Sequence, residues 1–228
     1  MKRGRTFNTL FMLSSIDGRI STGEGNERDF DKDLRNLKGL KEGLHQYYNL
    51  EKRTDFHSLN TGKVMAKIGV NTENCPINCP KVSFIIIDNH HLNETGIINL
   101  INRTKKLYLV TSNKNHPAFK LKDKIELIYY EKIDFNNLFS KLRKNYKIDR
   151  ITVQSGGTLN SILIREGLID QLSLVIAPAL IGGVNTPSLI DGSSLLSKDD
   201  LKLIKTLKLV KCNKLDNSYL HLVYDVKN

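Results

Sequence analysis

The chain has 228 residues, a formal net charge of +11 and 39% hydrophobic residues. This length and hydrophobic content are enough for a core, and 26% charged residues are typical of a globular rather than a disordered protein. No apolar run is long enough to span a membrane, and the basic start is not followed by a secretory signal. We therefore expect a cytoplasmic protein with no membrane partner. No linker interrupts the composition, so we expect a single domain over residues 1–228.

The positive charge suits either a polyanion or a phosphorylated small molecule as partner. Lysines are spread along the whole chain and form no dense arginine-rich block. This distribution favours a solvated, lysine-rich surface over a nucleic-acid-binding face. We expect a phosphorylated small molecule as substrate and no nucleic acid.

The three cysteines, Cys75, Cys79 and Cys212, are an odd set. Cys75 and Cys79 have the loose spacing of metal ligands, but no second Cys/His pair with matching spacing follows. A structural zinc normally needs four ligands. We expect no metal site.

The N-terminal third alternates between apolar and polar segments. Residues 6–13 are predicted to form a strand, and Asp17-Gly18 is a turn signal between apolar flanks. The Asp17 carboxylate either belongs to that turn only or faces a pocket at the strand end. Residues 29–48 have helical periodicity, as one helix or two, because Gly39 and Gly43 weaken it. A short strand over 54–59 and a polar turn over 60–63 follow.

From residue 82 to residue 177 strands alternate with helices or loops. The predicted strands are followed by turn residues or by helices, one of which begins after the capping residue Asp134. This alternation predicts a mainly parallel sheet covered on both faces. Residues 201–211 and 219–226 are predicted to form an antiparallel pair that closes one edge. The predicted strands of the alternating part are 82–88, 107–111, 125–130, 151–154 and 172–177.

Residues 155–158, Ser-Gly-Gly-Thr, lie between a predicted strand and a helix that ends near Gly167. Two glycines at the carboxyl end of a strand let a ligand approach bare backbone, and a helix N-terminus favours an anion. The sequence leaves two interpretations open. The segment is either a phosphate site or a tight turn with a Ser or Thr cap.

Four motifs carry a resemblance to a known family: residues 15–22 (SIDGRIST), 154–160 (QSGGTLN), 167–172 (GLIDQL) and 176–183 (IAPALIGG). In this order they resemble the reductase domain of the riboflavin-biosynthesis deaminase–reductase. That domain is similar in fold to dihydrofolate reductase. The resemblance implies a single-domain α/β fold with a mainly parallel central sheet, helices on both faces and an antiparallel C-terminal strand pair. The zinc ligands of the deaminase half are absent, so a stand-alone reductase domain is expected.

The resemblance also implies a cofactor and a substrate. The family uses NADPH to reduce 5-amino-6-(5-phosphoribosylamino)uracil, opening its ribose to a ribityl chain. Asp17 and Gln154 match positions in the catalytic region, and the Gly156–Gly157 peptide is suggested to be cis. Ser112-Asn113-Lys114 matches the place that holds the adenosine 2′-phosphate. The implied cofactor-binding residues are Thr22, Asn60, Thr61, Gly62, Lys63, Ser112, Asn113, Ser155, Gly156, Gly157 and Thr158.

Two departures from the family pattern concern the substrate. The family usually has a glutamate where this chain has Gln154, and a glutamine can act neither as an acid nor as a carboxylate partner. Many bifunctional relatives have a lysine where this chain has Phe11 or Met12. Three alternatives follow: a paralogous reductase with a pterin-like or unknown substrate, a non-catalytic nucleotide-binding module, and a basic nucleic-acid binder.

The resemblance finally implies a homodimer, since relatives dimerise. The C-terminal strand pair and the loop over residues 185–197 are the expected contact.

Overall fold

The structure is a computed structural model that describes residues 4–25, 27–72 and 82–227. The chain divides into two compact units. Unit 1 contains residues 1–7 and 55–155, and unit 2 contains residues 8–54 and 156–228. Cys75 and Cys79 lie outside the described residues.

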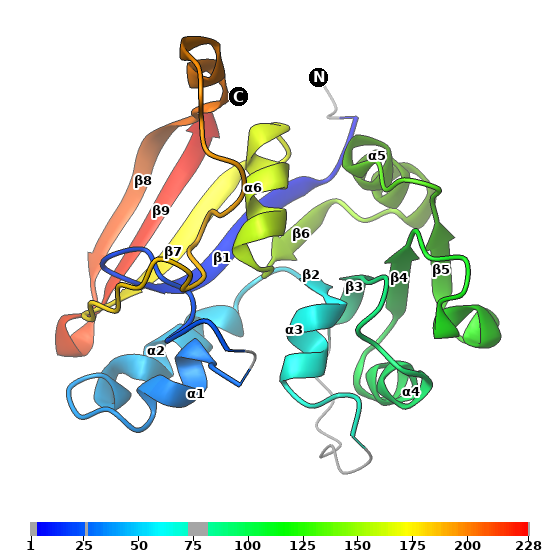
Figure 1. Cartoon of the computed structure of the whole chain (residues 1–228), viewed down its shortest axis with the longest axis horizontal. Coiled ribbons are helices and arrows are strands. Elements are labelled where there is room, and N and C mark those ends of the chain that lie inside the picture. The colour runs from blue at the N-terminus through cyan, green and yellow to red at the C-terminus, as the bar shows by residue number, and fades with distance from the viewer. Residues whose placement is uncertain (1–3, 26, 73–81, 228) are drawn as a thin grey trace. The chain divides into compact units, whose positions relative to one another are not determined.

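Unit 1 contains five strands in the order β5-β4-β3-β2-β6, and each of the four pairings is parallel (Figure 1). Parallel pairing places the carboxyl ends of neighbouring strands at one edge of a sheet. The strands are β2 (His57–Thr61), β3 (Ser83–Ile87), β4 (Leu107–Thr111), β5 (Glu126–Tyr129) and β6 (Arg150–Val153).

Helices cover both faces of the unit 1 strands. One face packs against α3 (Gly62–Lys67), α4 (Glu94–Arg103) and the 3-10 helix η1 (Pro117–Leu121) through a cluster that includes Ile86, Ile97 and Leu109. The other packs against α5 (Phe135–Tyr146), where the rings of Tyr108 and Tyr146 meet edge to face at 5.2 Å (Figure 1). The Asp134 side chain caps α5 by accepting from the Asn137 N–H at 2.9 Å, which confirms the predicted cap.

Unit 2 contains four strands in the order β1-β7-β9-β8. β1 and β7 pair in parallel, whereas β9 pairs antiparallel with both β7 and β8. The strands are β1 (Phe7–Ser15), β7 (Gln171–Ala177), β8 (Thr206–Lys214) and β9 (Leu220–Lys227). The helices are α1 (Phe30–Leu34), α2 (Lys41–Glu51), α6 (Gly157–Arg165) and the short 3-10 helices η2 (Lys198–Leu203) and η3 (Asp216–Ser218).

The predicted fold class is confirmed: the fold is α/β, its strands are mostly parallel and its C-terminal strands are antiparallel. Residues 29–48 form parts of two helices, α1 and α2, rather than one. Gly167 ends α6 with a φ of 68°, the left-handed conformation that was predicted. Among the described residues no helix is long and apolar enough to cross a membrane.

Three predictions about local structure were wrong. The strand predicted over 54–59 is β2, which ends at Thr61, so Asn60 and Thr61 lie in the strand and α3 follows without a turn. The strand predicted over 201–211 begins only at Thr206, because Ser197 and Asp200 form a capping box that starts η2. No peptide bond among the described residues is cis, so the suggested cis Gly156–Gly157 bond is also wrong.

The core of unit 2 depends on close packing between α2 and the chain before β9. Tyr219 is fully buried, and its hydroxyl donates to the Leu40 carbonyl at 2.8 Å. Gly43 lies against the Tyr219 ring, and a Cβ at this position would overlap the ring. The absence of a side chain at Gly43 therefore fits this packing.

We predict that Gly43→Ala lowers the free energy of unfolding by about 1–3 kcal/mol, because the added methyl group overpacks the Tyr219 site. Urea unfolding followed by circular dichroism measures the change. The exposed Asn49→Ala variant of the same helix is the control, expected to stay within about 0.5 kcal/mol of the unmodified chain. Equal stabilities of the two variants would contradict the packing argument.

Candidate functional site

A chain of hydrogen-bonded polar side chains connects β2 to Gln154, the residue after β6, in unit 1. The Asn60 side-chain amide donates to the Ser58 hydroxyl at 2.9 Å, and this hydroxyl donates to Gln154 Oε1 at 3.1 Å. Asn60 and Ser58 are both 5% exposed. The predicted residues Asn60 and Gln154 are thus brought together through Ser58, which the sequence did not single out because it lies within a strand.

The next predicted residues start α3. The Thr61 hydroxyl caps this helix by accepting from the Val64 N–H at 3.3 Å, while Lys63 is exposed. Gly62 lies against the carboxylate of Asp88, which a Cβ at Gly62 would overlap. The Thr61 cap and the close approach of Gly62 to Asp88 therefore have structural roles at the start of α3, in addition to the predicted role in cofactor binding.

Asp88 is a buried carboxylate directly after β3, and its side chain has no exposed surface. Its oxygens accept from the Leu92 N–H at 2.8 Å, from the His91 N–H at 3.1 Å and from Nε2 of His116 at 2.9 Å. Burial alone would raise the pKa of Asp88, but these hydrogen bonds outweigh it and lower the pKa to about 2. Asp88 is therefore an anion at neutral pH.

Asn89, the next residue, holds the turn after β4. Its side-chain oxygen accepts from the Ser112 N–H at 2.7 Å, from the Thr111 hydroxyl at 3.0 Å and from the Ser112 hydroxyl at 3.1 Å. An amide oxygen has two lone pairs, so three donors exceed its capacity. The Ser112 hydroxyl makes the longest of the three bonds and is the donor best able to turn toward a ligand.

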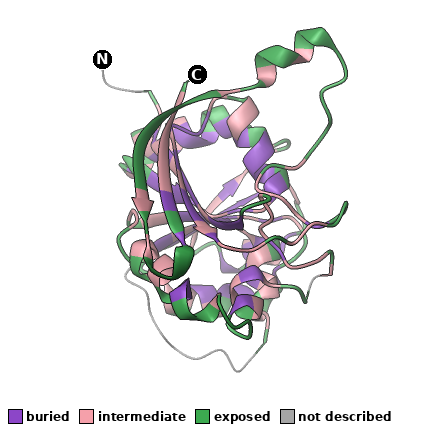
Figure 2. Ribbon diagram, turned by 90° about the vertical axis from the view of Figure 1, so that its left-hand side faces the viewer, coloured by how far each residue is buried: buried purple, intermediate pink, exposed green. Residues whose placement is uncertain are grey.

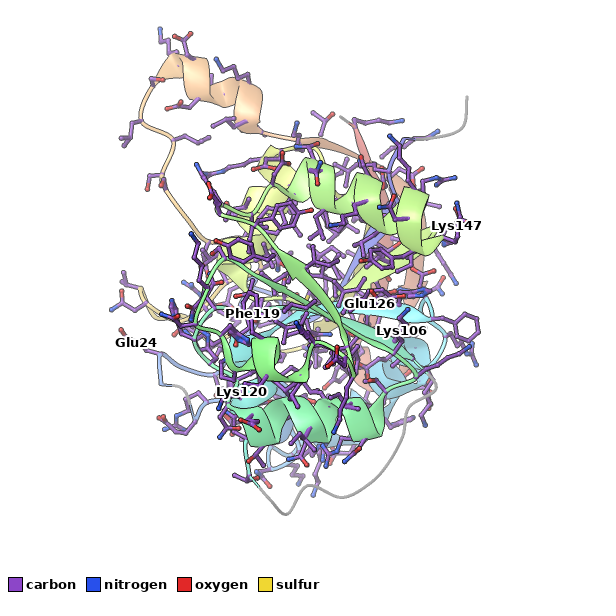
Figure 3. The ribbon with its side chains drawn as sticks, turned by 90° about the vertical axis from the view of Figure 1, so that its right-hand side faces the viewer. Glu24, Lys106, Phe119, Lys120, Glu126 and Lys147 are labelled. Carbon is purple, nitrogen blue, oxygen red and sulfur yellow. The ribbon has the colours of Figure 1, made fainter. Side chains whose placement is uncertain are left out.

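A surface cavity of about 430 Å³ opens beside this turn. It is lined by Lys114, Phe119 and Lys120, among others, and Figure 3 shows the last two on η1. The Lys120 ammonium group pairs with Glu94 of α4 at 3.2 Å. Glu94 also lines the cavity and neutralises Lys120, so Lys114 and the Phe119 ring are the groups that suit an anionic ligand with a planar group. Sequence reasoning missed Phe119 and Lys120, since neither has a local motif.

In unit 2 the predicted phosphate turn precedes α6. Gly156 is the N-cap residue of α6, and no side chain caps this end, so the Ser or Thr cap that was the alternative interpretation is not formed. A helix start leaves N–H groups without partners inside the helix. No atom lies within 4 Å of an ideal Cβ at Gly156, whereas a Cβ at Gly157 would overlap Ser188 and Asp191. Gly156 is thus open to a ligand, and Gly157 is packed against the 188–191 segment.

Asp17 holds the turn after β1 to a glycine pair. Its carboxylate accepts from the Ser15 hydroxyl at 2.6 Å, from the Gly182 N–H at 2.7 Å and from the Ile181 N–H at 3.2 Å. The Ser15 hydroxyl and the Gly182 N–H hold the pKa of Asp17 below its ordinary value. The carboxylate is therefore ionised at neutral pH and is an acceptor, not a proton donor.

Two other polar side chains of unit 2, Thr22 and Asp170, form hydrogen bonds within that unit. The Thr22 hydroxyl donates to the Asp33 carboxylate, within the same segment of chain. A cavity of about 600 Å³ is lined by Arg19, Arg165 and the segment from Val184 to Leu195. Asp170 accepts from the Asn8 N–H at 2.8 Å and so connects β1 to the residue before β7. Within the described ranges no group of three or more His, Cys, Asp or Glu side chains is placed to hold a metal ion.

A family model described as the RibD C-terminal domain matches residues 6–221. The chain belongs to this family.

Two curated relatives are named 2,5-diamino-6-ribosylamino-4(3H)-pyrimidinone 5′-phosphate reductase. The one from Archaeoglobus fulgidus is 32% identical over 77 residues, which cover 34% of this chain and 35% of the relative. The one from Methanothermobacter thermautotrophicus is 31% identical over 64 residues, 28% of this chain and 29% of the relative. The match thus covers about a third of each relative.

Solved structures establish the same fold at low sequence identity. RibD of Acinetobacter baumannii has a TM-score of 0.71 at 18% identity, over 100% of this chain and 60% of that one. The riboflavin biosynthesis reductase Rib7 of Saccharomyces cerevisiae has a TM-score of 0.60 at 17% identity, over 100% and 92%. Dihydrofolate reductase of Enterococcus faecalis has a TM-score of 0.51 at 10% identity, over 97% of both chains. The RibD family chain therefore has the dihydrofolate reductase-like fold that the motifs implied.

We predict that Asp88 makes the RibD family chain acid-sensitive. A carboxylate with a folded pKa of about 2 and an ordinary value of 3.8 stabilises the fold by about 2 kcal/mol above pH 4. This contribution is lost as the pH falls from about 4 to about 2. Urea unfolding of the unmodified chain and of Asp88→Asn at a series of pH values measures it. The stability difference between the two should shrink toward pH 2, and a difference independent of pH would contradict the prediction.

Proposed function

We propose that the chain is an NADPH-dependent reductase of riboflavin biosynthesis that acts on a phosphorylated ribosylamino-pyrimidine. The family match and the names of the curated relatives support this proposal. Those names favour 2,5-diamino-6-ribosylamino-4(3H)-pyrimidinone 5′-phosphate as the substrate over the uracil derivative that the family resemblance implied. Both compounds are to be tested as substrates. We also propose that residues 1–228 act as a single domain in the cytoplasm.

The observation that carries the proposal is the open backbone at Gly156. This glycine lies at the uncapped N-terminus of a nine-residue helix and has no atom within 4 Å of its Cβ position. Unpaired N–H groups and the helix dipole at such a site favour a phosphate. The remaining predicted contacts of unit 2, Thr22, Gly157 and Thr158, stay part of the proposal, as does Ser155 at the end of unit 1.

The turn after β4 in unit 1 offers groups that suit an adenosine phosphate. Ser112 offers a hydroxyl, Asn113 an amide and Lys114 a positive charge, beside a cavity of about 430 Å³. Asn60, Thr61, Gly62 and Lys63 are proposed as a second group of contacts in this unit. When bound, NADPH supplies the hydride, and the protein must bind and orient it.

Asp17 and Gln154 are proposed to orient the substrate rather than to donate a proton. The Gln154 amide has no acidic hydrogen, and its oxygen accepts from the Ser58 hydroxyl. The pKa of Asp17 is lowered, so its carboxylate is an acceptor at neutral pH. A proton needed at the reduced carbon would then come from water or from the substrate itself.

The decisive experiment is a titration with NADPH and with NADH, followed by nicotinamide fluorescence, and then addition of each pyrimidine. We expect saturable NADPH binding and loss of absorbance at the nicotinamide band with the diaminopyrimidinone. Gly156→Val is expected to raise the Kd for NADPH at least about tenfold, because its side chain would fill the space in front of the helix N-terminus.

Gly156→Val should leave the thermal unfolding midpoint nearly unchanged, since the Cβ position is open. Gly157→Val is the matched control and is expected to destabilise the fold, because its side chain meets Ser188 and Asp191. Binding of neither nucleotide would overturn the reductase proposal. Binding of NADPH without turnover of either pyrimidine would instead favour a non-catalytic nucleotide-binding module.

We further propose that the chain forms a homodimer through β8. This strand is at the edge of the β1-β7-β9-β8 arrangement and is exposed along most of its length (Figure 2). Leu207 and Leu209 point to the same face and are 45% and 51% exposed. An exposed apolar edge strand is a template for pairing with another chain. A second copy offers the same face.

We predict a dimer for the unmodified chain and a monomer for Leu207→Lys combined with Leu209→Lys, because two charges would have to be buried in the contact. Light scattering coupled to size-exclusion chromatography measures the mass. Thr206→Lys adds a charge on the opposite face of the same strand and should leave the dimer intact. A monomeric unmodified chain would refute this contact.

A further inference from the structure

A buried aspartate–histidine pair connects two loops of unit 1 that are distant in the sequence. Asp88 directly follows β3 and His116 lies in the turn after β4, and neither side chain has exposed surface. Nε2 of His116 is 2.9 Å from Oδ2 of Asp88. A buried polar pair of this kind is weak evidence for stability alone, because apolar residues can fill such a site equally well. The pair also holds one end of the turn that follows β4.

The hydrogen bonds of His116 fix which ring atom carries the hydrogen. Nδ1 accepts from the Ala118 N–H at 3.1 Å, so the ring hydrogen is assigned to Nε2, which donates to Asp88. The backbone N–H of His116 donates to the Asn113 carbonyl at 3.1 Å. One residue thus joins the turn, the start of η1 and the buried carboxylate.

The turn over residues 112–116 is held at both ends. Asn89 holds the first end by accepting from Ser112 through its side-chain oxygen and from the Asn113 side-chain amide through its carbonyl at 2.7 Å. His116 and Asp88 hold the other end. Lys114 lies between the two ends, is exposed and lines the cavity of about 430 Å³. The direction of the Lys114 stem therefore depends on both anchors.

We propose that Asp88 and His116 are positioning residues that fix the 112–116 turn so that Lys114 meets the 2′-phosphate of the cofactor, and that the chain thereby prefers NADPH to NADH. This inference rests on the proposed function. Asp88 itself does not contact the phosphate. Its charge is satisfied by donors from His116, His91 and Leu92, so the turn presents a cation and not an anion to the ligand.

The test compares two substitutions of the same histidine. His116→Asn keeps an oxygen near the position of Nδ1, which can still accept from Ala118, but loses the bond to Asp88. His116→Gln keeps an amide near the position of Nε2, which can still donate to Asp88. The control is His91→Ala, which removes the half-exposed ring on the other side of Asp88. For each protein the Kd values of NADPH and NADH are measured by nicotinamide fluorescence, together with the unfolding midpoint.

We expect His116→Asn to weaken NADPH binding about tenfold, the equivalent of one charge-assisted hydrogen bond, and to change NADH binding by less than about twofold. His116→Gln and His91→Ala should keep the ratio of the two Kd values near that of the unmodified chain. A merely structural role would weaken both nucleotides alike or lower only the unfolding midpoint, and either result would overturn the inference.

The outcomes also separate this inference from the proposed function. If the unmodified chain binds neither nucleotide, both are overturned. If it binds NADPH and NADH equally well, the positioning role toward the 2′-phosphate is overturned, while a nicotinamide-dependent reductase remains supported. If it prefers NADPH but His116→Asn keeps that preference, only the positioning role is overturned.

Discussion

Parallel pairing of β2, β3 and β4 is the constraint on which the site of unit 1 depends. Thr61 pairs with Ile87, and Ile87 pairs with Val110, so the three strands end at neighbouring positions. The loops that follow them must therefore start side by side, although they are separated by more than twenty residues of chain. This is why one carboxylate, Asp88, can lie against Gly62 and also bond to His116. A register shift would separate these groups.

The sequence predicts an element correctly where the side chains of that element match its burial. Residues 107–111 form β4 as predicted, because an apolar, β-branched run is typical of a buried strand. β2 was misplaced because its sequence, HSLNT, contains one apolar residue. Its polar side chains bond to one another, to Gln154 after β6 and to the start of α3. The start of β8 was predicted too early. A capping box formed by Ser197 and Asp200 starts the 3-10 helix η2, which occupies residues before β8. The local hydrophobic pattern shows neither the hydrogen-bond partners of β2 nor the capping box of η2.

The site was only partly predictable for the same reason. Motifs identified Gly156 and Gly157 together, but only the surroundings distinguish the open glycine from the one packed against Ser188 and Asp191. Asp88 and His116 lie 28 residues apart and carry no motif, so their contact requires the strand order. Lys114 lies three residues after the end of β4, and its role toward a ligand was implied by the family resemblance and stays a prediction. The residues that hold its turn in place carry no motif and could not be predicted.

The exchange of the family glutamate for Gln154 has a local physical explanation. Gln154 accepts a hydrogen bond from Ser58, which in turn accepts one from the buried Asn60. A glutamine joins this chain as a neutral acceptor and adds an amide donor, whereas a glutamate would bring a charge next to groups that are 5% exposed. The neutral chain therefore removes the need for a counter-charge at the end of β2. Because Gln154 has no acidic hydrogen, the proposed reduction would take its proton from another group.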